Sequence, residues 1–329
     1  METLPKNYKR QRRKLRLLHL KPHEAIRLCK GAFLSFLEKK RLEFPRMVSI
    51  EVTNNCNIAC STCPQPYVQG EKGYLNMDLF KKIIDECSQH PTLNTIVFTG
   101  FGEPLLHPQL ITMSRYVKSK GISYTRTYTN GVLLNKPNTD KLLLESEFDE
   151  ITLSLNAPTQ EIYKRIKNNQ TYNLVTENIE YFLKRRKFLK KKTLFVNLQL
   201  LKLNNVSYPI EDFNKKWMPL LKPGDCITIK YSHSFAGQVN DPGVGKVFGP
   251  RERSPCAQLS MYLFVSWNGD VVPCCVDPLK KLKIGNIGNS SLKDLWHSSK
   301  IKLMREIHIK KEYHRLPLCS DCETWRYFL

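Results

Sequence analysis

The sequence lacks any run of 18 or more apolar residues, which is the length that a helix needs to cross a membrane. No long apolar segment follows the basic N-terminus, so we expect no secretory signal peptide. Internal repeats and low-complexity tracts are absent as well. These absences argue against a protein with membrane-spanning helices, a secreted protein and a repeat protein, and they predict a cytoplasmic location.

Acidic residues are scarce, because 30 Asp and Glu stand against 52 Lys and Arg, for a formal net charge of +22. Residues 1–46 hold 14 basic and 4 acidic residues and so supply 14 − 4 = +10 of this charge. One face of a helix predicted there carries Ile26, Cys29, Phe33, Phe36 and Leu37. We expect a basic helical N-terminal extension packed on the main domain, with an anionic membrane surface as the alternative partner. Nucleic acid is less favoured, because no aromatic-rich basic platform accompanies the charge.

Eleven cysteines contrast with the absence of secretion signals. In a reducing compartment, clustered cysteines are typical of metal binding or catalysis rather than of disulfides. Cys29, Cys87 and Cys226 stand alone in apolar-patterned segments, and we predict that they are small buried hydrophobic residues. The other eight form the groups Cys56/Cys60/Cys63, Cys256, Cys274/Cys275 and Cys319/Cys322. This grouping is the main functional signal in the sequence.

Strand-like runs alternate with helix-like runs in the middle of the chain. The predicted strands cover residues 48–54, 94–100, 122–131, 149–156, 194–201 and 226–232. The predicted helices cover residues 77–89 (capped by Asn76), 109–121, 139–146, 173–191 and 209–221. Six such units predict an α/β fold, a partial (β/α)6 TIM-type barrel over residues 47–235. Chemistry in such barrels gathers at the carboxyl ends of the strands.

After about residue 235 the pattern changes to loops rich in Gly and Pro. A hairpin is predicted over residues 264–273, and five of the cysteines follow residue 250. We therefore expect a separate small domain over residues 236–329.

Cys56, Cys60 and Cys63 come directly after the first predicted strand, at the end of the barrel where chemistry is expected. Three thiolates can bind three irons of a 4Fe–4S cluster, which leaves the fourth iron open for a small molecule. A structural zinc site normally has four protein ligands. The alternative is therefore a zinc site with a distant fourth ligand, and the further motifs make it much less favoured.

The triplet resembles the signature of the radical S-adenosylmethionine (SAM) superfamily, and other motifs follow in matching places. "GFGEP" from Gly100 resembles the family motif at the second strand end. "TNG" from Thr129 and "SLN" from Ser154 resemble those at the third and fourth strand ends. The sequence departs twice from the family pattern, with Thr62 in place of a frequent aromatic residue and Phe101 in place of the usual Gly. Neither departure removes a ligand group, but the first leaves the adenine contact unassigned.

The resemblance implies that SAM chelates the open iron and that one electron cleaves it to a 5′-deoxyadenosyl radical. A flavodoxin- or ferredoxin-type reductant would supply the electron, and the radical would abstract hydrogen from a substrate C–H bond. The resemblance also implies that Glu103 receives the methionine ammonium of SAM, at a turn whose glycines permit close approach. The predicted SAM-binding residues are Gly100, Gly102, Glu103, Asn130, Ser154, Asn156, Asn197 and Gln199.

The C-terminal cysteines, with "WNGDVVPCC" and "CSDC", resemble the SPASM/Twitch extension of these enzymes. Four thiols are enough to close a second, auxiliary 4Fe–4S cluster, and the expected ligands are Cys256, Cys274, Cys319 and Cys322. The full SPASM form has more cysteines than the five present here, which favours the shorter Twitch form. Cys275 is left over as a substitute ligand, a silent neighbour or a catalytic hydrogen-atom donor. A zinc ribbon-like site is the alternative for the whole set.

For the reaction, the resemblance favours a radical SAM oxidoreductase that dehydrogenates or epimerises a sugar, an aminocyclitol or a related small molecule. An oxidation also needs a base, and His233 is the candidate, with a structural loop histidine as the alternative. Lys230 is predicted to hold an anionic substrate or to be a surface charge. Other functions remain open, because one fold hosts many chemistries. They are peptide or protein modification, and a non-catalytic iron–sulfur protein that binds nucleic acid or a membrane.

Overall fold

The computed structural model of the protein describes residues 42–191, 193–204, 206–239 and 253–325. Nearly all of these residues belong to one compact unit, Glu43–Phe328. The predicted basic helix of the N-terminal extension, together with Cys29, lies outside the described residues. Within the described residues, no helix combines the length and the apolar character that crossing a membrane requires.

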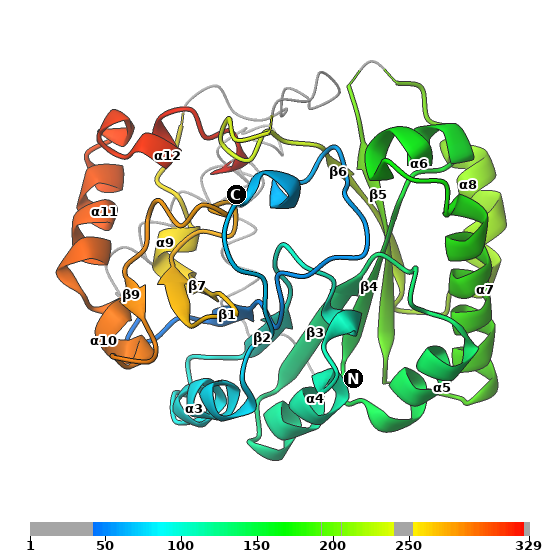
Figure 1. The fold of residues 1–329 in the computed structure, drawn as a ribbon, viewed down its shortest axis with the longest axis horizontal. Coiled ribbons are helices and arrows are strands. Elements are labelled where there is room, and N and C mark those ends of the chain that lie inside the picture. Colours follow the sequence, from blue (N-terminus) through cyan, green and yellow to red (C-terminus); the bar gives the residue numbers. More distant parts are fainter. Residues whose placement is uncertain (1–41, 192, 205, 240–252, 326–329) are drawn as a thin grey trace, which may run out of the picture. The chain divides into compact units, whose positions relative to one another are not determined.

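One sheet holds all the strands of the described residues, in the order β6-β5-β4-β3-β2-β1-β7-β8-β9 (Figure 1). The strands are β1 (Met47–Ile50), β2 (Thr95–Phe98), β3 (Tyr124–Thr129), β4 (Glu150–Asn156), β5 (Phe195–Lys202), β6 (Cys226–Tyr231), β7 (Tyr262–Val265), β8 (Asp270–Val272) and β9 (Gly285–Asn286). Each of the strands β1 to β5 pairs in parallel with the next one along the chain, so β1 to β6 form one parallel run. The predicted run of six parallel strands is therefore confirmed.

Helices connect the parallel strands and run around their outer side (Figure 1). The α-helices of the described residues are α3 (Met77–Ser88), α4 (Leu110–Ser119), α5 (Lys136–Glu145), α6 (Gln160–Lys167), α7 (Tyr172–Phe188), α8 (Ile210–Trp217), α9 (Gln258–Met261), α10 (Leu292–Trp296), α11 (Ser299–Ile309) and α12 (Pro317–Ser320). Short 3-10 helices are η1 (Gln65–Tyr67), η2 (Pro104–Leu106), η3 (Met218–Leu220) and η4 (Tyr313–Arg315). Helix α6 was not among the predicted helices.

Helix α3 shows how the sequence builds one of these units. The side chain of Asn76 accepts hydrogen bonds from the backbone N–H groups of Asp78 and Leu79, so the predicted cap is confirmed. Phe80 lies on the buried face of the helix, and its ring centroid is 5.8 Å from that of Phe98 on β2. Cys87, on the same face, is fully buried as predicted. The apolar stripe of the helix thus covers the outer face of the sheet.

The two faces of the parallel strands differ in character. Along β4, the buried residues Leu153 and Leu155 alternate with Ser154 and Asn156, which are partly exposed. Successive side chains of a strand point to opposite faces, so one face is apolar and the other carries polar groups. Cys226 was predicted to be buried, and this was wrong: it is exposed at the start of β6, an edge strand of the sheet.

The C-terminal region continues the same sheet, which the sequence did not predict. Strand β7 pairs in parallel with β1, in the register Met47↔Tyr262 to Ile50↔Val265. The predicted hairpin is confirmed, because β7 and β8 pair antiparallel. The pairing of β7 with β1 places the hairpin turn after Val265 beside the loop that follows β1 (Figure 1).

Candidate active site

The carboxyl ends of the six parallel strands surround a cavity of about 320 Å³. Residues at the end of every one of these strands contribute to its wall. Most of the sequence-predicted site residues meet there, namely Cys56, Cys60, Cys63, Gly100, Gly102, Glu103, Asn130, Ser154, Asn156, Gln199 and His233. Their convergence fits the rule that chemistry in such folds gathers at this end of the strands.

Cys56, Cys60 and Cys63 lie on the loop that follows β1. The backbone N–H of Cys63 donates to Cys60 O at 3.2 Å, and the Nδ2 of Asn130 approaches the Sγ of Cys56 to 4.0 Å. Burial raises the pKa of Cys63 to about 12 and also raises the pKa of Cys56. The irons of a cluster would stabilise the thiolate form of such buried thiols.

Single-ion metal sites are a different matter. In residues 42–191, 193–204, 206–239 and 253–325, no three histidine, cysteine or acidic side chains are gathered to hold one metal ion. A 4Fe–4S cluster does not require such a gathering, because each thiolate binds a different iron. Cys56, Cys60 and Cys63 all line the cavity, which is the donor set that three irons of a cluster would need.

Glu103 is a buried carboxylate on the cavity wall, with only 2% of its surface exposed. Its Oε2 accepts from the backbone N–H of Asn130 at 2.7 Å, and its Oε1 accepts from that of Leu105 at 3.1 Å. Burial raises the pKa of Glu103, and these hydrogen bonds oppose the rise. A desolvated carboxylate is suited to a cationic ligand group such as the ammonium of SAM, because the ion pair compensates for burial.

Residues 100–103, which we call the GFGE turn, pack directly on the cysteine loop. The backbone N–H of Glu103 donates to Asn55 O at 2.8 Å. A Cβ at Gly102 would lie 2.2 Å from Thr53 O, so any other residue would push the two segments apart. The glycine of the motif therefore serves the close packing of two backbone segments around the cavity.

Two buried polar atoms on the cavity wall have no hydrogen-bond partner among the described residues. They are the Oε1 of Gln199 and the Oγ of Ser232, on residues that are 8% and 1% exposed. Gln199 Nε2 donates to the Oδ1 of Asn156, whose backbone is held at φ 66° where β4 departs from regular pairing. Unsatisfied buried polar groups and such backbone strain are typical of ligand sites. The hydroxyl and amino groups of an adenosyl moiety fit this wall.

Lys167 is a cavity residue that the sequence reasoning missed. It lies at the end of α6 and is 2% exposed, and it lines the cavity together with Glu103 and the cysteines. Burial raises the pKa of Glu103 and of Cys56, and the charge of Lys167 counteracts this rise. Its position suits the carboxylate of SAM. The sequence gives only a weak signal for this position. Lys167 is followed by Asn168, a residue type that often ends helices, and Asn168 does end α6 in the left-handed conformation.

Further side chains at the ends of β3 and β6 complete the wall. Tyr128 and Tyr231 line the cavity and were not predicted, whereas Lys230 was left between a substrate contact and a surface charge. Lys230 is exposed to solvent but lines the cavity, with its Nζ 5.7 Å from the centroid of the Tyr128 ring. Tyr128, Lys230 and Tyr231 are separate from the predicted SAM motifs. We call the part of the cavity wall that they form the second polar edge.

His233, the predicted base, lies on this second edge. Burial and then the charge of Lys230 lower the pKa of His233 to about 4, so it is neutral near pH 7. Its Nδ1 accepts from the backbone N–H of Phe235 at 3.2 Å, which puts the ring proton on Nε2. In this state Nε2 donates a hydrogen bond rather than accepting a proton, which favours the structural alternative over the base.

Two predicted residues do not line the cavity. The Oδ1 of Asn197 accepts from the Oγ1 of Thr228 at 2.8 Å, which engages it between β5 and β6. Cys275 packs instead against a small apolar cluster that includes Tyr262 and Phe264. A cysteine in that position fits the silent-neighbour alternative better than a hydrogen-atom donor.

The remaining four thiols surround a second, much smaller cavity of about 20 Å³, which is lined by Cys256, Cys274, Cys319 and Cys322. Burial raises the pKa of Cys319 to about 12 and that of Cys256 to about 11. Cys274 lines this cavity and Cys275 does not, which favours Cys274 as the fourth ligand. As at the first site, the irons of a cluster would stabilise the thiolate form of these buried thiols.

Comparisons with known proteins were made on this basis. Residues 50–196 match the model of the radical SAM superfamily, and residues 256–323 match that of SPASM, an iron–sulfur cluster-binding domain. A cofactor-modifying protein of the tungsten-containing aldehyde ferredoxin oxidoreductase from Pyrococcus furiosus is 26% identical, over 83% of this chain and 86% of its own length. A SAM-dependent 2-deoxy-scyllo-inosamine dehydrogenase from Niallia circulans is 24% identical, over 84% and 92% respectively.

Among solved structures, SuiB of Streptococcus suis, bound to its precursor peptide SuiA, has a TM-score of 0.63 at 14% sequence identity. The match covers 93% of this chain and 77% of that chain, and it shows the same fold. Together these matches confirm the predicted family, the partial TIM-like barrel with its C-terminal SPASM domain, and the class of both cofactors.

Proposed function

Because the chain is a radical SAM enzyme with a C-terminal SPASM domain, we propose that it oxidises or epimerises a sugar, an aminocyclitol or a related small molecule. When bound, the iron–sulfur cluster and SAM supply the one-electron chemistry that removes a hydrogen atom from a carbon of the substrate. The protein's own residues bind and orient both molecules and keep water away from them.

In this proposal the walls of the cavity divide the work. Cys56, Cys60 and Cys63 hold three irons of the first cluster, and Glu103 and Lys167 pair with the ammonium and carboxylate of SAM. The unsatisfied oxygens of Gln199 and Ser232 accept hydrogen bonds from its nucleoside, next to Asn156 and Ser154. Asn130 anchors Glu103 through its backbone N–H at 2.7 Å.

The substrate would lie against the second polar edge, formed by Tyr128, Lys230, Tyr231 and His233. Hydroxyl, ammonium and imidazole N–H groups there can all hydrogen-bond to a polyol. The Nε2–H of His233 would donate to a substrate oxygen and so help to orient the C–H bond.

One observation carries the oxidative form of the proposal: the second thiol site is closed. Cys256, Cys274, Cys319 and Cys322 surround a cavity of only about 20 Å³. Four protein thiols would fill the ligand positions of a cluster and leave no iron open for a substrate. A cluster with four protein ligands would be suited to accept an electron. Loss of this electron from the substrate carbon radical, with release of its hydroxyl proton to solvent, would give a ketone.

The test uses the reconstituted protein with SAM, a flavodoxin-type reductant and 2-deoxy-scyllo-inosamine, the substrate in the name of the Niallia circulans relative. We expect SAM-dependent formation of 5′-deoxyadenosine and a product lighter by two hydrogens. Substrate carrying deuterium at the oxidised carbon should transfer it to 5′-deoxyadenosine. Deuterium transfer from a neutral cyclitol or sugar, but not from the amine, would move the substrate within the proposed class. SAM cleavage with no transfer from any of them would contradict the proposal.

A peptide substrate is the second candidate, because the fold also matches SuiB, whose solved complex contains a precursor peptide. The relative from Pyrococcus furiosus is named a cofactor-modifying protein, and this name points neither to a peptide nor to a sugar. Deuterium transfer from labelled peptides, with none from the cyclitol panel, would favour this candidate.

A further inference from the structure

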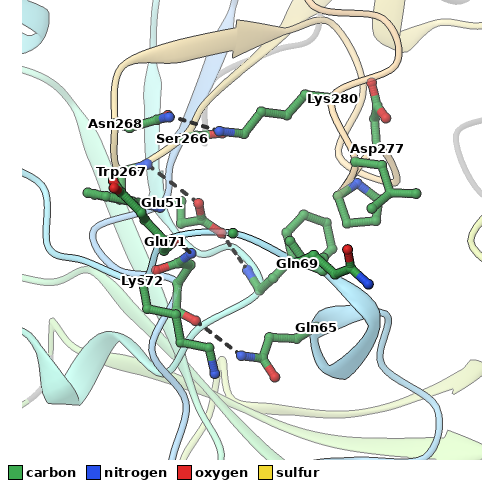
Figure 2. A pocket seen from close by; sticks show the side chains of 16 residues that line it. Glu51, Gln65, Gln69, Glu71, Lys72, Ser266, Trp267, Asn268, Asp277 and Lys280 are labelled. Atoms are coloured by element: carbon green, nitrogen blue, oxygen red, sulfur yellow. Dashed lines mark hydrogen bonds between the residues drawn. The ribbon is translucent and has the colours of Figure 1, made fainter.

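A second cavity, of about 360 Å³, is lined by residues of both matched domains, and Figure 2 shows the side chains around it. Phe101 of the GFGE turn lines both cavities and therefore forms part of the wall between them. The far side of the second cavity comes from the C-terminal domain, including Trp267 of the β7–β8 turn and Lys280 (Figure 2). The cavity is thus lined by both matched domains.

Glu51 lies where these parts meet (Figure 2). It follows β1 and is 3% exposed, and its Oε1 accepts from the backbone N–H of Phe101 at 2.9 Å. Its Oε2 accepts from the backbone N–H of Trp267 at a longer 3.4 Å. One carboxylate therefore bridges the GFGE turn and the hairpin of the C-terminal domain, with the stronger hold on the turn.

Gly100 shows how closely the turn is fitted to this carboxylate. A Cβ at Gly100 would lie 2.6 Å from the Cγ of Glu51 and 2.7 Å from its Oε1. Real Cβ atoms do not approach other atoms so closely, so only glycine lets the turn pack flat on the Glu51 side chain. Two independent features, a hydrogen bond and a missing side chain, therefore join the same pair of segments.

The burial of Glu51 is costly. Within the described residues it makes no ion pair, and burial raises the pKa of Glu51 to about 7 in spite of the two backbone hydrogen bonds. A neutral or apolar residue would avoid this cost. The turn and the hairpin also touch through the rings of Phe101 and Phe264, whose centroids are 6.0 Å apart. The arrangement is explained if the carboxylate adds a polar link between the two backbones to this apolar contact.

We propose that Glu51 is a positioning residue that holds the GFGE turn in its SAM-binding shape and ties that shape to the hairpin of the C-terminal domain. Glu103, at the end of the same turn, is the group that would meet the SAM ammonium, so the inference rests on that part of the proposed function. It does not depend on the substrate. Loss of the Glu51 bridge should weaken SAM binding without removing either cluster.

Asp277 provides a matched control, because it lines the same cavity and is 1% exposed. Its oxygens accept from the backbone N–H groups of Lys281 and Leu282, at 2.9 and 2.8 Å, within its own loop. It therefore shares the burial and charge of Glu51 but not the contact with the GFGE turn. Effects of Glu51 that come merely from a buried carboxylate should appear in Asp277→Asn as well.

The first measurement uses hydrogen exchange in the protein with both clusters and no SAM. In Glu51→Ala, which removes both side-chain acceptors, the Phe101 amide should exchange about tenfold faster than in the wild type. In Asp277→Asn it should be unchanged. Equal protection of Phe101 in the wild type and in Glu51→Ala would overturn the proposal, because the side chain would then hold nothing.

The second measurement is the dissociation constant for SAM, followed by the change in the spectrum of the reduced cluster. Glu51→Ala should bind SAM about tenfold more weakly with unchanged iron content, and Gly100→Ala should do the same. Glu51→Gln should lie between Ala and wild type. Unchanged affinity in Glu51→Ala at full iron content would overturn the proposal, and so would an equal loss in Asp277→Asn.

Glu103→Gln separates this inference from the proposed function. If Glu103→Gln weakens SAM binding and the Glu51 variants do not, the positioning role alone is wrong. If Glu103→Gln leaves SAM binding intact, the proposed SAM contact of the turn fails, and the positioning role fails with it.

Discussion

Two groups of cysteines in this protein have the same chemistry and opposite surroundings. Cys56, Cys60 and Cys63 lie along a cavity of about 320 Å³, whose wall also carries charged and amide groups. Cys256, Cys274, Cys319 and Cys322 enclose about 20 Å³ and are packed among mostly apolar residues. The first group lies on a cavity with space and polarity for a ligand on its cluster. The second encloses far less space, although Arg253, Gln258 and His308 also line it.

The difference lies in the architecture rather than in the ligand type. The three-cysteine loop stands at the open end of a parallel sheet, where six strand ends converge. The four-cysteine site draws its thiols from loops and short helices, which close around it. A cluster with three protein ligands keeps one iron open for an exchangeable ligand, whereas a cluster with four protein ligands has no open iron. The following changes test this comparison, from the largest expected effect to the smallest.

Cys60→Ala should have the largest effect, because it removes one of only three ligands of the open cluster. We expect SAM cleavage to fall to background and the iron content of the reconstituted protein to drop from about eight to about four. Iron analysis and the yield of 5′-deoxyadenosine measure both quantities. Full iron content in this variant would show that the loop does not hold a cluster. The contrast between an open and a closed cluster site would then be wrong for the three-cysteine group.

Cys319→Ala should also cost about four irons, but with a different consequence. Reductive SAM cleavage should persist at a reduced rate, because the open site is intact, while substrate oxidation should be lost. The melting temperature should fall by about 5 °C or more, since cluster binding stabilises the loops that carry the ligands. A variant that kept full oxidation with half the iron would show that the closed site takes no electron from the substrate.

Several features of both regions followed from the sequence, because they depend on local patterns. The three-cysteine spacing, the GFGE turn and the alternation along β4 need no knowledge of distant partners. The cap at Asn76 was equally local and is present as predicted. The closed site was predicted from the CxxC pair and from the resemblance, and Cys256 joins that pair across more than sixty residues.

Other features depended on tertiary packing that the sequence does not encode locally. A short apolar run such as Tyr262–Val265 does not reveal which strand it joins, so its pairing with β1 was missed. Lys167 lies on a helix rich in basic residues, where a lysine is expected to be exposed to solvent. In the structure it is buried at the cavity. The prediction that Cys226 is buried failed for the opposite reason. An apolar pattern does not reveal that a strand lies at the edge of its sheet, where side chains are exposed.

His233 tests the polar rim of the open site. Burial and Lys230 lower the pKa of His233 from 6.5 to about 4, so folding opposes protonation, and this residue destabilises the protein only as pH falls below about 6.5. Between pH 6.5 and 8 the residue stays neutral, and His233→Asn should change substrate oxidation by a constant factor of about three or less. If the rate of substrate oxidation by the wild type depends on pH in this window and the rate of His233→Asn does not, His233 acts as the base after all.

Cys275 should show the smallest effect, and it decides which thiols belong to which region. It packs on the apolar cluster of Tyr262 and Phe264 between the two sites and lines neither cavity. Cys275→Ala should therefore keep all its iron, with SAM cleavage and substrate oxidation within about twofold of wild type. Cys274→Ala is the matched control and should lose about four irons.

If Cys275→Ala loses iron and Cys274→Ala does not, Cys275 is the fourth ligand of the auxiliary cluster. The four-thiol site would then face the cavity of the three-cysteine loop. A third result is equally clear. If Cys275→Ala keeps its iron and cleaves SAM but fails to form product, the thiol acts on the substrate radical. Cys275 would then reach the reacting carbon although it lines neither cavity. The residues that line the two cavities would therefore not include every group that acts on the substrate.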